Sequence, residues 1–207
     1  MALTTYTELK TSIGDWLNRS DLTATIPDFI SLAEAQIERT LRTRQMLTRT
    51  TLTVDGEFES TPADFLETRA LKLTSTNPVT PLSFMTMDGL DEEATKFTAS
   101  GRPKFFGVVG TEFRFVPTPD ASYTSEIVYF AKLSKLSSSV ATNFLLTSSP
   151  DIYLYGALLQ AAPYLQDDAR MQVWATLYER ALTDLQVADD RGSTSGGNLL
   201  TRAKTFG

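Results

Sequence analysis

Two groups of carboxylates are the side chains with which this sequence could carry out acid–base or metal chemistry. Residues 91–93 are Asp-Glu-Glu with Asp88 nearby, and Asp167 is followed directly by Asp168. An oxygen-ligand cation site needs a binding loop of the EF-hand kind, which the first group lacks. Acids are favourable near a helix N-terminus and as N-caps. We therefore interpret the first group as a solvated helix face and the second as an N-cap, and a glycosidase-like carboxylate pair stays open.

No cysteine and no histidine occur among the 207 residues. Their absence excludes disulfides, thiolate nucleophiles, zinc sites of the Cys/His kind and triads built on histidine. Histidine is also the side chain most often used for proton transfer near neutral pH. We therefore expect that the protein is not an enzyme and has no catalytic residue, no cofactor and no metal site.

Aromatic side chains gather between residues 105 and 130, where they could form a platform on which sugars or nucleic-acid bases stack. Side chains of this kind more often form the core of a sheet, so a carbohydrate-binding module stays open as the alternative. The residues are Phe105, Phe106, Phe113, Phe115, Tyr123, Tyr129 and Phe130. Gly107 and Gly110 flank predicted strands rather than a helix start, so they indicate hairpin turns and not a phosphate loop.

Four arginines stand out because the chain is acidic, with a formal net charge of −6. A chain of this charge is not a general nucleic-acid binder, which needs clustered bases. The arginines could bind phosphate or form an interface with an acidic groove on a partner, or they could be a helix C-terminus with solvated charge. Both readings stay open for Arg39, Arg42, Arg44 and Arg49.

The C-terminal residues differ in charge from the rest. Residues 191–207 hold three bases and no acid, which leaves 16 bases against 25 acids, a charge of −9, for the body. The stretch 193–198 has the composition of a flexible linker, and apolar anchors interleaved with cations follow it. We predict that residues 192–207 are a flexible tail that docks on a partner. The docking residues would be Leu199, Leu200, Arg202, Lys204 and Phe206.

The hydrophobic periodicity predicts helices at both ends of the chain and strands between them. Thr5 and Glu8 have the spacing of a capping box, and a second helix begins near residue 26 with Pro27 in its first turn. Strand patterns run from about 46 to 135, and Asp55-Gly56 is typical of a hairpin turn. A helix begins at residue 150 and should kink or break at Pro163, and a last helix ends near residue 191.

These elements predict an α+β fold. A helical bundle of two N-terminal and two C-terminal helices is expected from residues 1–45 and 150–191, with a β-rich antiparallel insertion at 46–149 and the flexible tail at 192–207. No run approaches the roughly 18 apolar residues of a membrane span. The N-terminus shows no signal-peptide pattern, so we expect synthesis in the cytoplasm.

Ten short stretches, taken in their order and spacing, resemble the head-to-tail adaptor (connector) proteins of short-tailed and related tailed bacteriophages. The likeness runs from about residue 1 to residue 190, and no single stretch is specific. The stretches are residues 1–10 (Met-Ala-Leu-Thr-Thr-Tyr-Thr-Glu-Leu-Lys), 15–19 (Asp-Trp-Leu-Asn-Arg), 26–30 (Ile-Pro-Asp-Phe-Ile), 33–35 (Ala-Glu-Ala), 41–44 (Leu-Arg-Thr-Arg), 62–67 (Pro-Ala-Asp-Phe-Leu-Glu), 101–103 (Gly-Arg-Pro), 116–120 (Val-Pro-Thr-Pro-Asp), 129–130 (Tyr-Phe) and 150–158 (Pro-Asp-Ile-Tyr-Leu-Tyr-Gly-Ala-Leu).

The resemblance implies a structural virion protein of the neck between capsid and tail, made in the host cytoplasm. It implies a dodecameric ring that contacts the portal protein on one side and the tail nozzle or tail tube on the other. Genomic DNA would pass through the ring without specific binding, and the tail at 192–207 would dock on the portal. The alternative is a tail or baseplate module that recognises surface carbohydrate. Neither reading implies a membrane or a cofactor.

Overall fold

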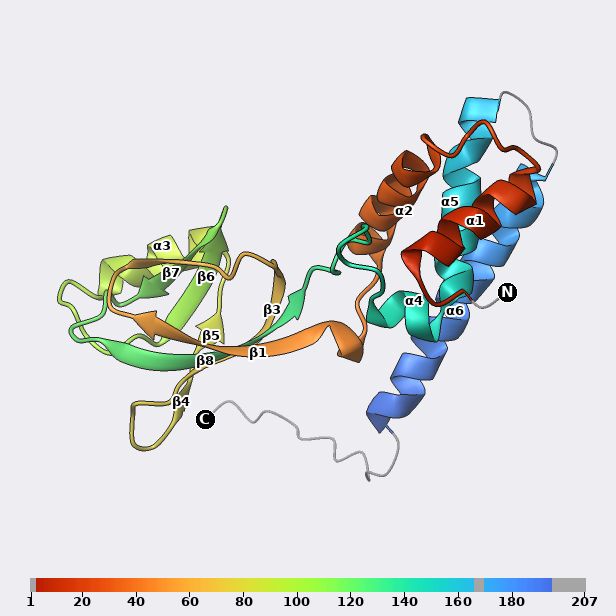
Figure 1. Cartoon of the computed structure of the whole chain (residues 1–207). Helices are drawn as coiled ribbons and strands as arrows, with labels where there is room; N and C mark the ends of the chain where they lie inside the picture. Colours follow the sequence, from red (N-terminus) through yellow and green to blue (C-terminus); the bar gives the residue numbers. More distant parts are fainter. Residues whose placement is uncertain (1–2, 166–169, 195–207) are drawn as a thin grey trace. The chain divides into compact units, whose positions relative to one another are not determined.

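The computed structural model describes residues 3–165 and 170–194, and the chain divides into two compact units (Figure 1). The helical unit comprises Met1–Gln45 and Leu133–Gly207, and the sheet unit comprises Met46–Lys132. Residues 133–149, which the sequence patterns assigned to the β-rich insertion, lie in the helical unit. The protein is a mixed α+β fold, as predicted.

Five of the six α-helices of the described residues belong to the helical unit. They are α1 (Tyr6–Leu17), α2 (Ile26–Thr40), α4 (Phe144–Ser148), α5 (Pro150–Leu165) and α6 (Met171–Thr194), and a short 3₁₀ turn, η1 (Arg44–Met46), follows α2.

Local sequence signals determine where the first two helices begin. The backbone N–H of Glu8 donates to Thr5 Oγ1 at 3.3 Å, and the Glu8 carboxylate accepts from the Thr5 N–H at 3.0 Å. This reciprocal pair satisfies two amides that the helix start leaves unpaired, so the predicted capping box is confirmed. Pro27 lies in the first turn of α2, where its missing N–H has no cost, which is also as predicted.

Helix α5 is the centre of the helical unit, since α1, α2, α4 and α6 all contact it (Figure 1). Eight of its residues are buried. The break expected at Pro163 does not occur there, because α5 continues to Leu165. Pro163 lies in the last turn, so only one carbonyl of the preceding turn loses its donor. Asp167 and Asp168 lie outside the described residues.

A buried carboxylate on α2 holds the segment that returns from the sheet unit. Glu34 is 5% exposed, and its Oε1 accepts from the Leu136 N–H at 2.7 Å and from the Tyr153 hydroxyl at 3.4 Å. The Tyr153 oxygen in turn accepts from Asn143 Nδ2 at 2.7 Å. Asn143 also caps α4 through the Leu146 N–H at 2.9 Å. One carboxylate thus orders both ends of the segment 134–143.

Replacing Glu34 should change how the stability of the helical unit depends on pH. Burial raises the pKa of Glu34 above its usual value, although the hydrogen bonds from Leu136 and Tyr153 oppose this shift. The folded state therefore binds a proton at Glu34 more tightly than the unfolded state does, so protonation of Glu34 stabilises the fold. This contribution to the free energy of unfolding is fully present below about pH 4.5 and is lost as pH rises through the pKa of Glu34 in the folded state. The variant Glu34→Gln should lack this dependence. Urea unfolding, followed by the fluorescence of Trp16 and Trp174, measures it.

The matched control is Glu34→Ala, which removes the acceptor of a buried N–H and should cost about 1–3 kcal/mol at every pH. Both tryptophans of the chain lie in the helical unit, so their fluorescence reports on that unit. If the free energy of unfolding of Glu34→Gln depended on pH as that of the wild-type protein does, the carboxyl of Glu34 would not be the source of the dependence.

The sheet unit contains every strand of the described residues and helix α3 (Met87–Lys96). One sheet has the order β1-β8-β3-β4 and the other the order β2-β7-β6-β5. All pairs are antiparallel except β5 with β6. The strands are β1 (Leu47–Val54), β2 (Phe58–Ser60), β3 (Phe65–Leu73), β4 (Thr80–Pro81), β5 (Ser83–Phe84), β6 (Phe105–Val109), β7 (Glu112–Val116) and β8 (Tyr123–Ala131).

The predicted hairpin at Asp55-Gly56 is wrong. Strands β1 and β2, which flank it, belong to different sheets, and β1 pairs along its whole length with β8. The turn residues do bend the chain there. The N–H groups of Gly56 and Asp55 donate to Oε1 of Glu59 at 2.8 and 3.2 Å instead of to a paired strand. The turn therefore passes the chain from one sheet to the other.

One apolar core fills the space between the two sheets, and α3 covers the outer face of the second sheet. Val54, Leu71 and Ile127 of the first sheet cluster with Phe106 and Phe113 of the second, all 2% exposed or less. On the opposite side of β6, a side chain at Gly107 would place its Cβ 2.6 Å from Leu90 Cδ1 and 2.9 Å from the Met85 carbonyl oxygen. Glycine therefore permits the close packing of α3.

The variant Gly107→Ala should loosen α3. A Cβ at this position forces apart α3 and β6, and overpacking of this kind costs about 1–3 kcal/mol. Hydrogen exchange measured by mass spectrometry should show faster exchange over residues 86–109. Gly101→Ala is the matched control, because its Cβ would meet Pro117 Cγ at an ordinary 3.6 Å. Equal exchange in the two variants would show that α3 does not depend on this contact.

Within residues 3–165 and 170–194, none of the helices combines the length and the apolar character that crossing a bilayer requires.

Candidate functional site

Arg42, one of the four predicted interface arginines, caps the end of α2. Its Nη1 donates to the carbonyl oxygens of Glu38 at 2.9 Å and Leu41 at 2.7 Å. The last carbonyls of a helix have no partner within the helix and carry partial negative charge. Its guanidinium therefore has a structural role.

Arg44 is tied to helix α6. Both its backbone N–H and its Nε donate to Oδ1 of Asp189, each at 3.1 Å. Asp189 therefore holds the chain just after α2 by main chain and side chain together. Since the Arg44 side chain is about half exposed, the ion pair alone adds little, and the backbone hydrogen bond carries most of the contact.

The other two arginines lie on exposed surfaces of different units. On the outer face of the first sheet, Arg49 pairs with Glu126 at 3.2 Å, and Lys72 pairs with the same carboxylate at 2.7 Å. Arg39 is exposed near the end of α2 and forms no ion pair with any residue that the structure describes. The four arginines therefore do not act as one set, and Arg39 is the one whose charge stays available.

Three of the four acidic residues of α3 lie beside a cation. Asp91 forms an ion pair with Arg114, which also pairs with Glu57 at 2.9 Å. Glu92 and Glu93 pair with Lys96 at 3.6 and 2.7 Å. Three or more acids do not gather into a metal site anywhere in the described chain. The group is a salt-bridged helix face, in agreement with the solvated-face interpretation.

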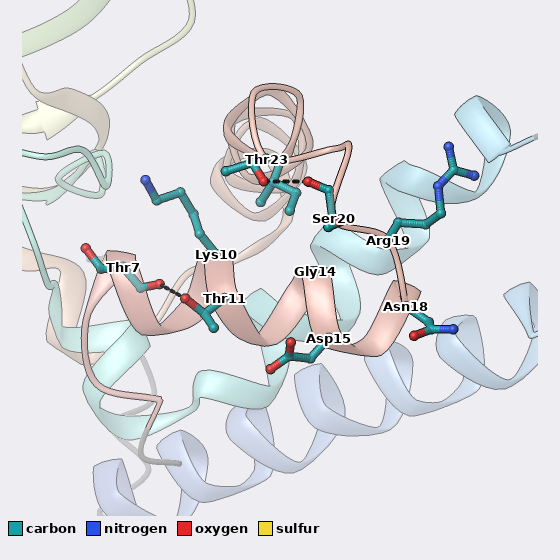
Figure 2. A pocket seen from close by; sticks show the side chains of 10 residues that line it. Thr7, Lys10, Thr11, Gly14, Asp15, Asn18, Arg19, Ser20 and Thr23 are labelled. Atoms are coloured by element: carbon teal, nitrogen blue, oxygen red, sulfur yellow. Dashed lines mark hydrogen bonds between the residues drawn. The ribbon is translucent and has the colours of Figure 1, made fainter.

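A polar groove of about 580 Å³ lies along α1 and the turn that precedes α2 (Figure 2). Two of its four hydroxyls are already used as donors: Thr11 Oγ1 donates to the Thr7 carbonyl at 3.1 Å, and Thr23 Oγ1 donates to the Ser20 carbonyl at 2.9 Å. The guanidinium of Arg19 is likewise held by Asp21. Part of the donor capacity of the groove is therefore already used within the chain.

The groove lacks the aromatic walls of a sugar site. Its lining residues are Thr7, Lys10, Thr11, Gly14, Asp15, Asn18, Arg19, Ser20, Thr23 and Ile26. The aromatic set that suggested a sugar platform supplies much of the core between the sheets instead, since Phe106, Phe113, Phe115 and Tyr129 are all 3% exposed or less. Neither the groove nor the core between the sheets therefore offers an aromatic sugar platform.

Glu34 is the polar residue that the sequence patterns missed. It lies four residues after Ile30 and three before Ile37, both buried on the face of α2 that packs inward. A carboxylate at that spacing falls on the apolar face of the helix, so the pattern contained the signal. The predicted docking residues from Leu199 to Phe206 lie outside the described residues.

Most of the polar side chains described above bind other parts of the chain instead of converging on a pocket. A family model for the SU10 adaptor protein matches residues 4–200. The chain therefore belongs to the SU10 adaptor protein family, and it is a structural adaptor of a bacteriophage and a component of the virion. Such a family is in general not enzymatic. No curated protein matches the chain.

The two arginines at the end of α2 should respond differently to removal. Arg42→Ala should lower the free energy of unfolding of the helical unit by about 1–2 kcal/mol, because two carbonyls lose a charged donor. Arg39→Ala should change it by less than about 0.5 kcal/mol. Urea unfolding monitored by tryptophan fluorescence compares them. Equal losses would mean that Arg39 also has a structural partner and is not available for an interface.

Proposed function

We propose that this protein is the head-to-tail adaptor of its phage, and that its copies form a dodecameric ring which joins the portal to the tail nozzle or tail tube. The observation that carries the proposal is the match of the adaptor family to residues 4–200. The ring would lie in the neck between capsid and tail, after synthesis in the host cytoplasm, and would have no contact with a membrane.

The ring would line the DNA exit channel without binding DNA specifically. The chain outside residues 191–207 carries 16 bases and 25 acids. Surfaces that hold phosphate tightly need clustered bases, and the exposed Arg49 and Lys72 share one carboxylate. DNA could therefore pass such a lining without being retained by it.

The protein would act through binding alone, with no catalytic residue, cofactor or metal. The chain has no histidine and no cysteine, and three of the four carboxylates of α3 are paired with cations. Asp167 and Asp168, the other candidate acids, would serve the helix start and not a reaction. Arg39 would contribute its free charge to a contact with a neighbouring protein.

The C-terminal tail would fix the adaptor to the portal. Leu199, Leu200 and Phe206 supply apolar anchors, and Arg202 and Lys204 supply positive charge. Such a segment suits a groove between portal subunits with acids at its rim. Because a ring repeats the contact around its axis, avidity would hold the joint even where one tail binds weakly.

Deleting residues 193–207 should abolish stable binding to portal-bearing heads, with an affinity loss of at least about a hundredfold, as expected when a multivalent contact is removed. Negative-stain images of heads mixed with the protein, together with co-sedimentation, measure the binding. The matched control carries residues 193–207 in scrambled order. Binding of the truncated protein as tight as that of the full chain would refute the docking role, and images with no ring at the portal would refute the adaptor function.

A further inference from the structure

Strand β1 presents a long sheet edge with which no other strand of the described sheet unit pairs. It lies at the margin of its sheet and pairs with β8 on one side only (Figure 1). The register with β8 runs through all eight residues without a bulge. Strand edges of this kind pair readily with further strands, and proteins usually blunt them by shortening, bulges or proline.

The other edges of the two sheets are blunted in this way. Strand β4 covers β3 only at Lys72 and Leu73, but the register of β3 with β8 is shifted between Phe65 and Glu67 and again between Thr68 and Ala70. Strand β2 has three residues, and β4 and β5 have two each. Strand β4 also ends in Pro81, which has no N–H to donate. Strand β1 contains no proline or glycine, and its single charged residue is Arg49. The contrast singles out β1 as an edge kept open for pairing.

The register shows which backbone groups are free. The Thr124 carbonyl accepts from the Thr74 N–H, so Thr124 directs its backbone groups toward β3 and away from β1. Thr53 is opposite Thr124, and antiparallel pairs alternate between bonded and non-bonded. The odd-numbered residues of β1 therefore direct their N–H and C=O groups to the open edge. They are Leu47, Arg49, Thr51 and Thr53.

We propose that a second copy of this chain occupies the edge, by two-fold antiparallel pairing of β1 with β1 centred on Thr50. This register places Leu47 opposite Thr53 of the partner copy and Arg49 opposite Thr51, so all four free residues are paired by about eight hydrogen bonds. Centring on Thr51 would leave Leu47 without a strand partner. Centring on Arg49 would place two guanidinium groups directly opposite each other, which is unfavourable.

The contact closes on itself. A two-fold interface uses the same edge on both copies, so association stops at a dimer and does not continue into fibres. A cyclic ring has no two-fold axis between neighbours, so the dimer is a state of the free protein that ring formation must open. The edge is thus protected before assembly. This inference does not depend on the proposed adaptor function and can succeed or fail independently of it.

Disulfide trapping tests the register, and the chain has no cysteine to interfere. Thr50→Cys places the two Cys Cα atoms in a non-hydrogen-bonded pair about 4.5 Å apart, within the range of a disulfide. Mild oxidation should give one dimer band. The matched control Thr53→Cys separates the two thiols by about 20 Å along the strands and should stay monomeric on denaturing gels. Equal cross-linking at both positions, or none at position 50, overturns the proposal.

A second variant tests the edge itself. Thr51→Pro removes an N–H that faces outward, so the pairing with β8 is kept while the dimer loses a hydrogen bond from each copy. Sedimentation velocity across a concentration series should show dimer weakened at least about tenfold, while Thr51→Val, which keeps the N–H, should leave it unchanged. Circular dichroism confirms that both variants fold. A wild-type protein that stays monomeric or closes rings alone, or a dimer unaffected by Thr51→Pro, overturns the proposal.

Discussion

The helical unit depends on the burial of α5, a helix that is apolar on nearly every side. A helix of this kind cannot be stable at a surface, so it requires neighbours all around it. Those neighbours come from both ends of the chain: α1 and α2 precede the sheet unit, and α4 and α6 follow it. Neither half has a complete core without the other, which makes the sheet unit an insertion between two segments that are stable only together.

Apolar burial has no direction, so polar contacts must determine how the two halves align. Each of the relevant hydrogen bonds joins a residue before the insertion to one after it. Gln160 Nε2 donates to Gln36 Oε1 at 2.7 Å, and the Tyr6 N–H donates to the Ala141 carbonyl at 2.7 Å. The bond from Leu136 to Glu34 is of the same kind. The bond to Glu34 constrains the alignment most, because a buried carboxylate is costly unless its hydrogen-bond donors are present.

The features that the sequence predicted correctly are local ones. The capping box at Thr5 and Glu8 and the proline in the first turn of α2 depend on neighbours within one turn, so residue types and spacing suffice. The hairpin at Asp55-Gly56 failed because the turn pattern is local while the strand pairing is not, and β1 takes its partner from a strand at the far end of the unit. The arginines show the same limit, since nothing in the spacing of Arg42 and Arg44 distinguishes a helix cap from a link to α6.

The topology of the insertion explains why its first strand is exposed. The chain enters the sheet unit through β1 and leaves through β8, and these strands are antiparallel neighbours, with Leu47 opposite Phe130. The two ends of the insertion therefore lie together, which lets such a unit fold within another. Strand β8 pairs with β3 on its other side, and no further strand of the described sheet unit pairs with β1, so the entering strand lies at the margin. Strand β1 needs its full length to pair with β8. The strand through which the chain enters the sheet unit therefore also has a long open edge, which only association with another chain can cover.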